Sequence, residues 1–114
     1  MRVALAAFAF GLAVLAATPA LARPARCVIT AAGERAWRGP CDFMADGGGS
    51  FGIRPTRGHF PDGIDLISVS LIRPGVADVR GLTPDGVNSR WGEARRSRRD
   101  RACWVGEDFS ICVY

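Results

Sequence analysis

The sequence predicts an all-β domain, built as a small disulfide-stapled antiparallel meander, sandwich or barrel. Segments with the composition of short strands recur about every eight to twelve residues, bounded by Gly, Pro or Asp. Four cysteines fall into two closely spaced pairs, as expected of links between neighbouring strands. After the N-terminal apolar run, no segment has the periodic apolar face of a long helix.

Residues 1–22, MRVALAAFAFGLAVLAATPALA, have the pattern of a secretory signal peptide. Arg2 precedes an apolar run, and the final Ala-Leu-Ala has the small-x-small form of a signal-peptidase site. An uncleaved membrane anchor is the alternative, but Pro19 and the cleavage pattern favour removal. We therefore expect one all-β domain over residues 23–114, located in the periplasm or secreted.

Four cysteines in an exported chain indicate disulfide bonds, because compartments outside the cytoplasm are oxidising. They are Cys27, Cys41, Cys103 and Cys112. No Cys-x-x-Cys motif occurs and the chain has one histidine. We therefore expect no metal site, no thioredoxin-like redox motif and no cofactor.

The spacing favours pairing each cysteine with its neighbour in the sequence. If Glu-Asp is a two-residue loop in ACWVGEDFSICVY, Cys103 lies directly opposite Cys112. If Gly-Glu-Arg is a three-residue loop in CVITAAGERAWRGPC, Cys27 lies directly opposite Cys41. Opposed strand residues lie about 4.5–5.5 Å apart at Cα, within the range of a disulfide. We predict the pairs Cys27–Cys41 and Cys103–Cys112.

Turn residues divide the intervening chain into further strands. A Gly-rich turn at 47–49 joins the first two, and Pro-Asp-Gly, Arg-Pro-Gly and Thr-Pro-Asp-Gly precede the others. We expect these strands near residues 41–45, 50–54, 64–72, 76–82 and 87–92. A short helical turn over 93–99 is compatible with the sequence, although no apolar stripe gives it a face to bury.

Two features resemble parts of catalytic sites without the partners that catalysis needs. The segment GGSFG at 48–52 matches G-x-S-x-G, but the residues after it do not start the helix of a nucleophile elbow. His59, with Asp62 or Asp65 nearby, would be the general base of a small enzyme. No nucleophile accompanies it, because the cysteines are expected to be oxidised. We predict no catalytic residues and a protein that is not an enzyme.

The three tryptophans, Trp37, Trp91 and Trp104, are expected in the core or against hairpins. The alternative is an exposed platform for carbohydrate or peptide, because exposed tryptophan is uncommon without a partner.

The basic charge is concentrated in the stretch RWGEARRSRRDRACW. Residues 90–101 hold six arginines and two acids, whereas residues 23–114 hold 14 arginines and 11 acids altogether. Arginine offers forked donors to phosphate and carboxylate, so such a cluster is typical of an anion-binding site. The candidate ligands of an anion are Arg90, Arg95, Arg96, Arg98, Arg99 and Arg101. The alternative is a solvated, mobile loop before the last hairpin.

The expected partner follows from the compartment. Outside the cytoplasm nucleic acid is not expected, and an anionic envelope component or an acidic protein fits the arginines better. Anionic lipid head groups are one such envelope component, so the expected partners include the surface of a membrane, which the protein would contact peripherally.

The segments CDFMADGGGSFGI and RRSRRDRACWVGEDFSIC resemble a set of small exported bacterial proteins of unassigned function. Those proteins share a C-x-F…GGSF segment and a closing A-C-W-V…C hairpin, so the resemblance implies a β fold and no particular activity. A broader resemblance is to periplasmic lysozyme inhibitors, which are small disulfide-linked β-barrels. Their inhibitory loop has no residue-by-residue match here, and a cationic lysozyme would be repelled by the arginines.

Three functions are left open. The leading expectation is a noncatalytic exported protein that binds an anionic surface through the arginines. The second is an inhibitor of a secreted hydrolase that uses a rigid hairpin tip as its plug. The third is a small enzyme centred on His59.

Overall fold

The structure, a computed structural model, describes residues 22–114 together with Ala4, Ala6, Ala9 and Gly11. The signal-peptide prediction, apart from these four positions and Ala22, lies outside the described residues. No helix in the described part of the chain is long and apolar enough to cross a membrane.

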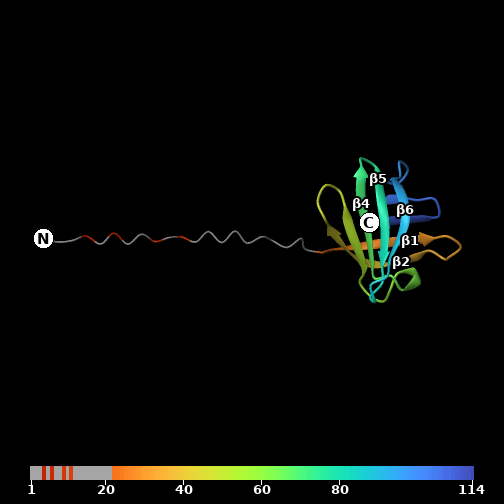
Figure 1. The fold of residues 1–114 in the computed structure, drawn as a ribbon, viewed down its shortest axis with the longest axis horizontal. Coiled ribbons are helices and arrows are strands. Elements are labelled where there is room, and N and C mark those ends of the chain that lie inside the picture. The colour runs from red at the N-terminus through yellow and green to blue at the C-terminus, as the bar shows by residue number, and fades with distance from the viewer. Residues whose placement is uncertain (1–3, 5, 7–8, 10, 12–21) are drawn as a thin grey trace.

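The described chain folds into a closed barrel of eight antiparallel strands (Figure 1). The strands are β1 (Arg23–Ala31), β2 (Trp37–Ala45), β3 (Phe51–Pro55), β4 (Leu66–Arg73), β5 (Val76–Leu82), β6 (Asn88–Arg96), β7 (Cys103–Val105) and β8 (Phe109–Val113). Each strand pairs with the next along the chain, and β8 closes the barrel by pairing with β1. A single short 3-10 turn, η1 (Pro61–Gly63), lies between β3 and β4. The predicted all-β fold class is confirmed, and of its three architectures the molecule adopts the barrel.

The core fills the barrel because alternate residues of each strand point inward. On β4, for example, Ile67 and Val69 are fully buried, and Ser70, which follows Val69, is exposed. The fully buried aliphatic side chains are Ile29, Ile53, Ile67, Val69, Val79 and Ile111. These residues come from five of the eight strands, so one apolar core holds the whole barrel together.

Both predicted disulfides are present, and one of the two predicted registers is correct. Cys103 lies directly opposite Cys112, as expected for the last hairpin. Cys27 pairs in register with Gly39 rather than with Cys41, so its disulfide crosses the β1–β2 ladder diagonally at a Cα separation of 5.8 Å. The expected three-residue loop is therefore wrong.

The loop between β1 and β2 is longer because Trp37 starts β2 opposite Ile29. The Trp37 indole packs edge-on against Phe60, with ring centroids 4.8 Å apart. It also covers the backbone at Gly39, where an added Cβ would lie 3.1 Å from the ring. This packing fixes the register two residues away from the one that the loop count predicts.

The helical turn over 93–99 that the sequence left open does not form, because β6 continues through Arg96. Ala94 is buried inside the barrel, and Arg95 and Arg96 pair with Val105 and Trp104 of β7. A helix here would remove the backbone pairing that joins β6 to β7.

Candidate anion-binding site

The antiparallel strands bring all connections to one or other end of the barrel. The end that we call the arginine end comprises the start of β1, the ends of β6 and β8 and the connections 46–50, 74–75 and 97–102. The other, which we call the acidic end, comprises the connections 32–36, 56–65, 83–87 and 106–108. The acidic-end connections carry two arginines, Arg35 and Arg57, and six acids, Glu34, Asp62, Asp65, Asp85, Glu107 and Asp108. The two ends of the molecule therefore differ in charge.

The structure separates the six arginines that the sequence groups together. Arg96, at the end of β6, and Arg101, in the connection 97–102, line one cavity at the arginine end. Arg98 and Arg99 are exposed in the same connection, and Arg95 is exposed on β6. Arg90 lies toward the other end of β6, so it is not part of the arginine end.

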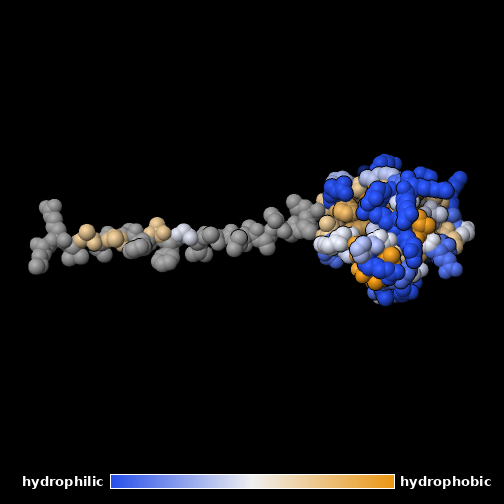
Figure 2. Space-filling model, turned by 90° about the horizontal axis from the view of Figure 1, so that it is seen from above, coloured by the Kyte–Doolittle hydropathy of each residue, from blue (hydrophilic) through white to orange (hydrophobic). Residues whose placement is uncertain are grey.

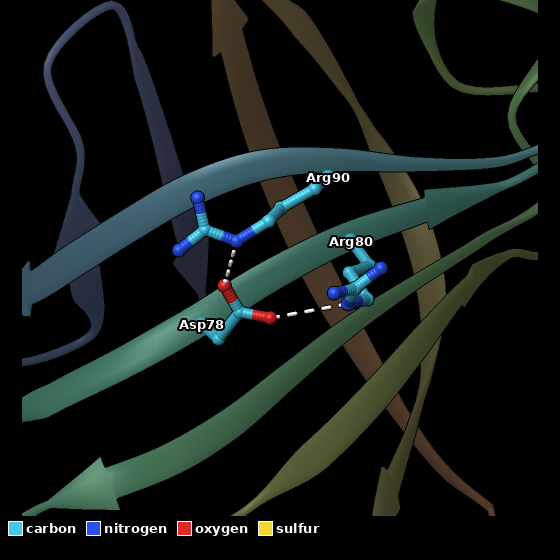
Figure 3. Close-up of polar contacts among 3 residues, drawn as sticks. All are labelled: Asp78, Arg80 and Arg90. Carbon is cyan, nitrogen blue, oxygen red and sulfur yellow. Dashed lines mark hydrogen bonds and ion pairs between the residues drawn. The ribbon is translucent and has the colours of Figure 1, made fainter.

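Arg90 is held on the outer face of the barrel by Asp78 of β5 (Figure 3). Its Nε lies 2.8 Å from Asp78 Oδ1 as an ion pair, although the two groups do not form an aligned hydrogen bond. On the same carboxylate, Oδ2 accepts a hydrogen bond from Arg80 Nε at 3.1 Å. Because its charge is already partnered, Arg90 is a poor candidate for binding an external anion.

The cavity at the arginine end is the mouth of the barrel, with a volume of about 280 Å³. Three arginines and three aromatic residues form most of its lining: Arg23, Arg96, Arg101, Phe43, Phe51 and Trp104. We call this cavity the mouth pocket. The chain thus places cationic and apolar groups side by side at one opening of the barrel.

Strand alternation places two of these arginines at the mouth. Arg23 precedes Ala25, Cys27 and Ile29 at intervals of two, which are the positions of β1 whose side chains pack in the core. Likewise, Arg96 follows the buried Ala94 by two residues on β6. Both are therefore inward-facing positions at the rim, where the apolar interior ends.

Aromatic rings hold these two guanidinium groups. Arg23 lies over Phe43 at 4.8 Å from the ring centroid, and Arg96 lies over Trp104 at 5.7 Å. In addition, Arg96 Nε donates a hydrogen bond to the Arg101 carbonyl at 2.9 Å. Such cation–π contacts restrict a guanidinium without neutralising its charge.

The connection 97–102 is a hydrogen-bonded turn. Ser97 Oγ accepts hydrogen bonds from the backbone N–H groups of Arg99 and Asp100, both at 3.2 Å. Asp100 Oδ1 accepts one from the Ala102 N–H at 3.0 Å, and Oδ2 accepts one from the Tyr114 hydroxyl. These hydrogen bonds connect the two halves of the turn to each other and to the end of the chain.

This contact also changes the proton affinity of the tyrosine. The hydrogen bond to Asp100, then desolvation and the charge of the same carboxylate, raise the pKa of Tyr114 above its ordinary value. The Tyr114 hydroxyl therefore stays protonated and continues to donate to the turn at neutral pH.

The features that resembled catalytic groups have structural roles or stand alone. Ser50 Oγ accepts a hydrogen bond from the Leu71 N–H at 2.9 Å, which joins the 46–50 connection to β4. His59 is exposed in the connection before η1. Within residues 22–114 and the four isolated positions, no group of three or more His, Cys, Asp or Glu side chains could hold a metal ion.

The tryptophans pack as expected. Trp104 is buried, while Trp37 and Trp91 are half-buried and pack edge-on against Phe60 and Phe109.

Sequence reasoning missed Arg23, Phe43 and Phe51 as members of the candidate site. For Arg23, the spacing of two from Ala25, Cys27 and Ile29 was the available signal that it faces inward.

No protein-family model, curated protein or solved structure matches this chain.

Proposed function

We propose that this protein is a noncatalytic, exported binding protein that contacts an anionic envelope component through the arginine end of its barrel. The observation that carries the proposal is that five arginines at this end form no ion pair with any described residue: Arg23, Arg96, Arg98, Arg99 and Arg101. Unpaired guanidinium groups gathered on one surface create a positive potential that attracts and orients anions.

The compartment supports this proposal. Two disulfides and no free cysteine among the described residues indicate an oxidising location. The proposed location is the periplasm or the medium, where anionic lipids, lipopolysaccharide and wall polymers are accessible. An acidic protein partner is the alternative target for the same surface.

Surface hydropathy fits recognition through charge. Hydrophilic residues cover most of the face of the barrel that Figure 2 shows, and hydrophobic residues form small separate patches. Binding to this surface should therefore be governed by ionic strength, because the Debye length is only about 8 Å at physiological salt.

The test compares binding of the oxidised protein to anionic and zwitterionic vesicles and to envelope extract, at low and moderate salt. We expect retention on the anionic material that falls steeply as salt is added. Arg98→Ala with Arg99→Ala should weaken it, whereas Arg35→Ala with Arg57→Ala, an equal loss of charge at the acidic end, should not. Salt-insensitive retention, or equal loss in both double variants, would contradict the proposal.

A second candidate function is inhibition of a secreted hydrolase, and the acidic end is the observation that favours it. The hairpin of β7 and β8 carries Glu107 and Asp108 at its tip and is cross-linked at its base by Cys103–Cys112. A rigid, negatively charged tip is attracted to the cleft of a cationic enzyme, whereas the arginine end would be repelled by it. This function predicts stoichiometric loss of one enzyme's activity that Glu107→Ala with Asp108→Ala abolishes; no inhibition across a hydrolase panel would count against it.

A further inference from the structure

We propose that the mouth pocket binds an organic phosphate monoester, with the phosphate among the arginines and the organic group on the aromatic residues. The inference rests on the proposed anion-binding function and adds to it a defined site and ligand class. The residues that carry it are Arg23, Arg96, Arg101, Phe43, Phe51 and Trp104.

The charge of the pocket favours a dianion. Three arginines line one cavity, and none of them forms an ion pair with a described carboxylate. Asp100 is the acid in the adjoining turn, but its two oxygens accept hydrogen bonds from Ala102 and Tyr114. Repulsion among the three cations is therefore relieved best by a ligand that brings more than one negative charge.

The number of donors favours phosphate over carboxylate. Each guanidinium offers several N–H groups in a planar fork, and a carboxylate has only two oxygens to receive them. A phosphate monoester presents three terminal oxygens and about −1.5 to −2 charges at neutral pH. Three arginines around one cavity can thus each engage a separate oxygen.

The pocket is prepared for this contact before a ligand arrives. Phe43 and Trp104 hold the guanidinium groups of Arg23 and Arg96, and the Arg101 carbonyl fixes Arg96 Nε. The terminal amino groups of Arg96 have no hydrogen-bond partner among the described residues. Groups held in this way lose little conformational freedom on binding, which increases affinity.

The aromatic lining calls for an organic substituent on the phosphate. Phe43 and Phe51 lie against each other with ring centroids 5.1 Å apart, and Trp104 lines the same cavity. Phe43 is half-buried, and Phe51 and Trp104 expose only 8% and 4% of their surface, so the apolar area that remains open to a ligand is small. Inorganic phosphate would leave this area in contact with water, whereas an attached ring or short chain would cover it. The volume of about 280 Å³ equals roughly nine water volumes, which suits a small ester or a lipid head group.

The first experiment is calorimetric titration of the oxidised protein, in phosphate-free buffer, with phenyl phosphate, inorganic phosphate and benzoate. We expect phenyl phosphate to bind more tightly than either of the others, because it alone combines the dianion with an apolar group. Benzoate or inorganic phosphate binding as tightly as phenyl phosphate would overturn the ligand class.

Variants connect binding with the pocket. Arg96→Lys keeps the charge but removes the fork, and Arg23→Gln removes a rim cation; each should weaken phenyl phosphate binding roughly tenfold or more. The control is Arg57→Gln, which loses an exposed arginine at the acidic end and should bind as the wild type does. Circular dichroism and the unfolding midpoint show whether each variant is folded, and unchanged affinity in both folded pocket variants would overturn the site.

A vesicle arm distinguishes a soluble ligand from a lipid head group. Binding to vesicles that contain phosphatidic acid, displaced by phenyl phosphate, would assign the pocket to a phosphorylated lipid. Binding of phenyl phosphate without vesicle binding would assign it to a soluble ester, and failure of both would overturn the inference.

The outcome can separate this inference from the proposed function. If Arg98→Ala with Arg99→Ala weakens anionic binding but the pocket variants do not, the arginine end binds anions by its outer turn alone. The proposed function would then stand and the mouth-pocket inference would fall.

Discussion

The hydroxyl of Tyr114 donates a hydrogen bond to Oδ2 of Asp100 across 2.5 Å, joining the end of the chain to the arginine-rich turn. Asp100 in turn fixes the backbone of Ala102, which lines the mouth pocket. The backbone of Tyr114 pairs with Arg26 of β1 in both directions, so the tyrosine is itself anchored to the barrel. This chain of contacts connects the conformation of the turn to the strand pairing that closes the barrel.

The first prediction concerns alkaline pH. Tyr114 is the only tyrosine, and its pKa is raised in the folded state by the Asp100 hydrogen bond. The folded state therefore binds this proton more tightly than the unfolded state does. The contribution to stability is complete below the ordinary pKa of 10.0 and is lost as the pH rises through the folded-state pKa. Tyrosinate absorbance should titrate above the midpoint of the denatured protein, and a midpoint at or below it would contradict the raised pKa.

The second prediction concerns the disulfides. Removing Cys103–Cys112 as a double serine variant should lower the free energy of unfolding by about 2–3 kcal/mol, because the link closes a short loop. Removing Cys27–Cys41 should cost more, since it closes a longer loop and both of its residues are 1% exposed. Denaturant unfolding without reductant measures both, and equal stability of the two variants would contradict the ranking.

The third prediction tests a close packing contact. A Cβ added at Gly81 of β5 would lie 2.4 Å from Ile64 Cδ1 and 2.9 Å from Trp91 Nε1. We expect Gly81→Ala to lower the free energy of unfolding by about 1–3 kcal/mol through overpacking. Gly52→Ala is the matched control, because its nearest contact is longer, 3.3 Å from Leu66 Cδ1, and includes no rigid ring. An equal loss of stability in both variants would contradict this, because it would show that replacing a strand glycine, rather than the close contact at Gly81, lowers the free energy of unfolding.

The fourth prediction concerns the carboxylate between two arginines. Asp78→Asn removes the charge that Arg80 and Arg90 share, and the arginine side chains are 44% and 55% exposed. Because solvent screens exposed pairs, the loss should be below about 1 kcal/mol and should shrink as salt is added. Asp46→Asn serves as a control, since Asp46 forms no ion pair within the described chain. A salt-independent loss would point to the buried Oδ1 of Asp78 instead of the ion pairs.

Local turn chemistry made much of the fold predictable. The strand after Arg-Pro-Gly has the expected bounds, 76–82, and the Gly-rich turn occupies the expected place between β2 and β3. The register of β1 against β2 was not predictable in this way, because it depends on Trp37 packing against Phe60, which lies far along the chain. The sequence could not decide between a closed barrel and an open sheet for the same reason. The pairing of β1 with β8, which closes the barrel, joins residues from the two ends of the domain.

The candidate site was predictable only in part. Composition identified the segment that contains Arg96 and Arg101, because six arginines in twelve residues stand out in any sequence. It could not separate them from Arg90, whose partner Asp78 lies on a neighbouring strand. Nor could it join Arg23 to them, since β1 and β6 come together only when the barrel forms.

The pairing between β6 and β7 has a mechanical consequence. These strands pair at two positions only, Arg95 with Val105 and Arg96 with Trp104, whereas β1 and β2 pair at seven. Neither disulfide crosses this seam: one joins β1 to β2 and the other joins β7 to β8. We expect the barrel to open first between β6 and β7. The hairpin of β7 and β8 would then separate from β6 as one disulfide-linked unit and stay paired with β1 through β8. Arg95 and Arg96, two of the candidate anion ligands, therefore also form the pairing between β6 and β7. A ligand bound to Arg96 would stabilise this pairing and oppose the opening of the barrel.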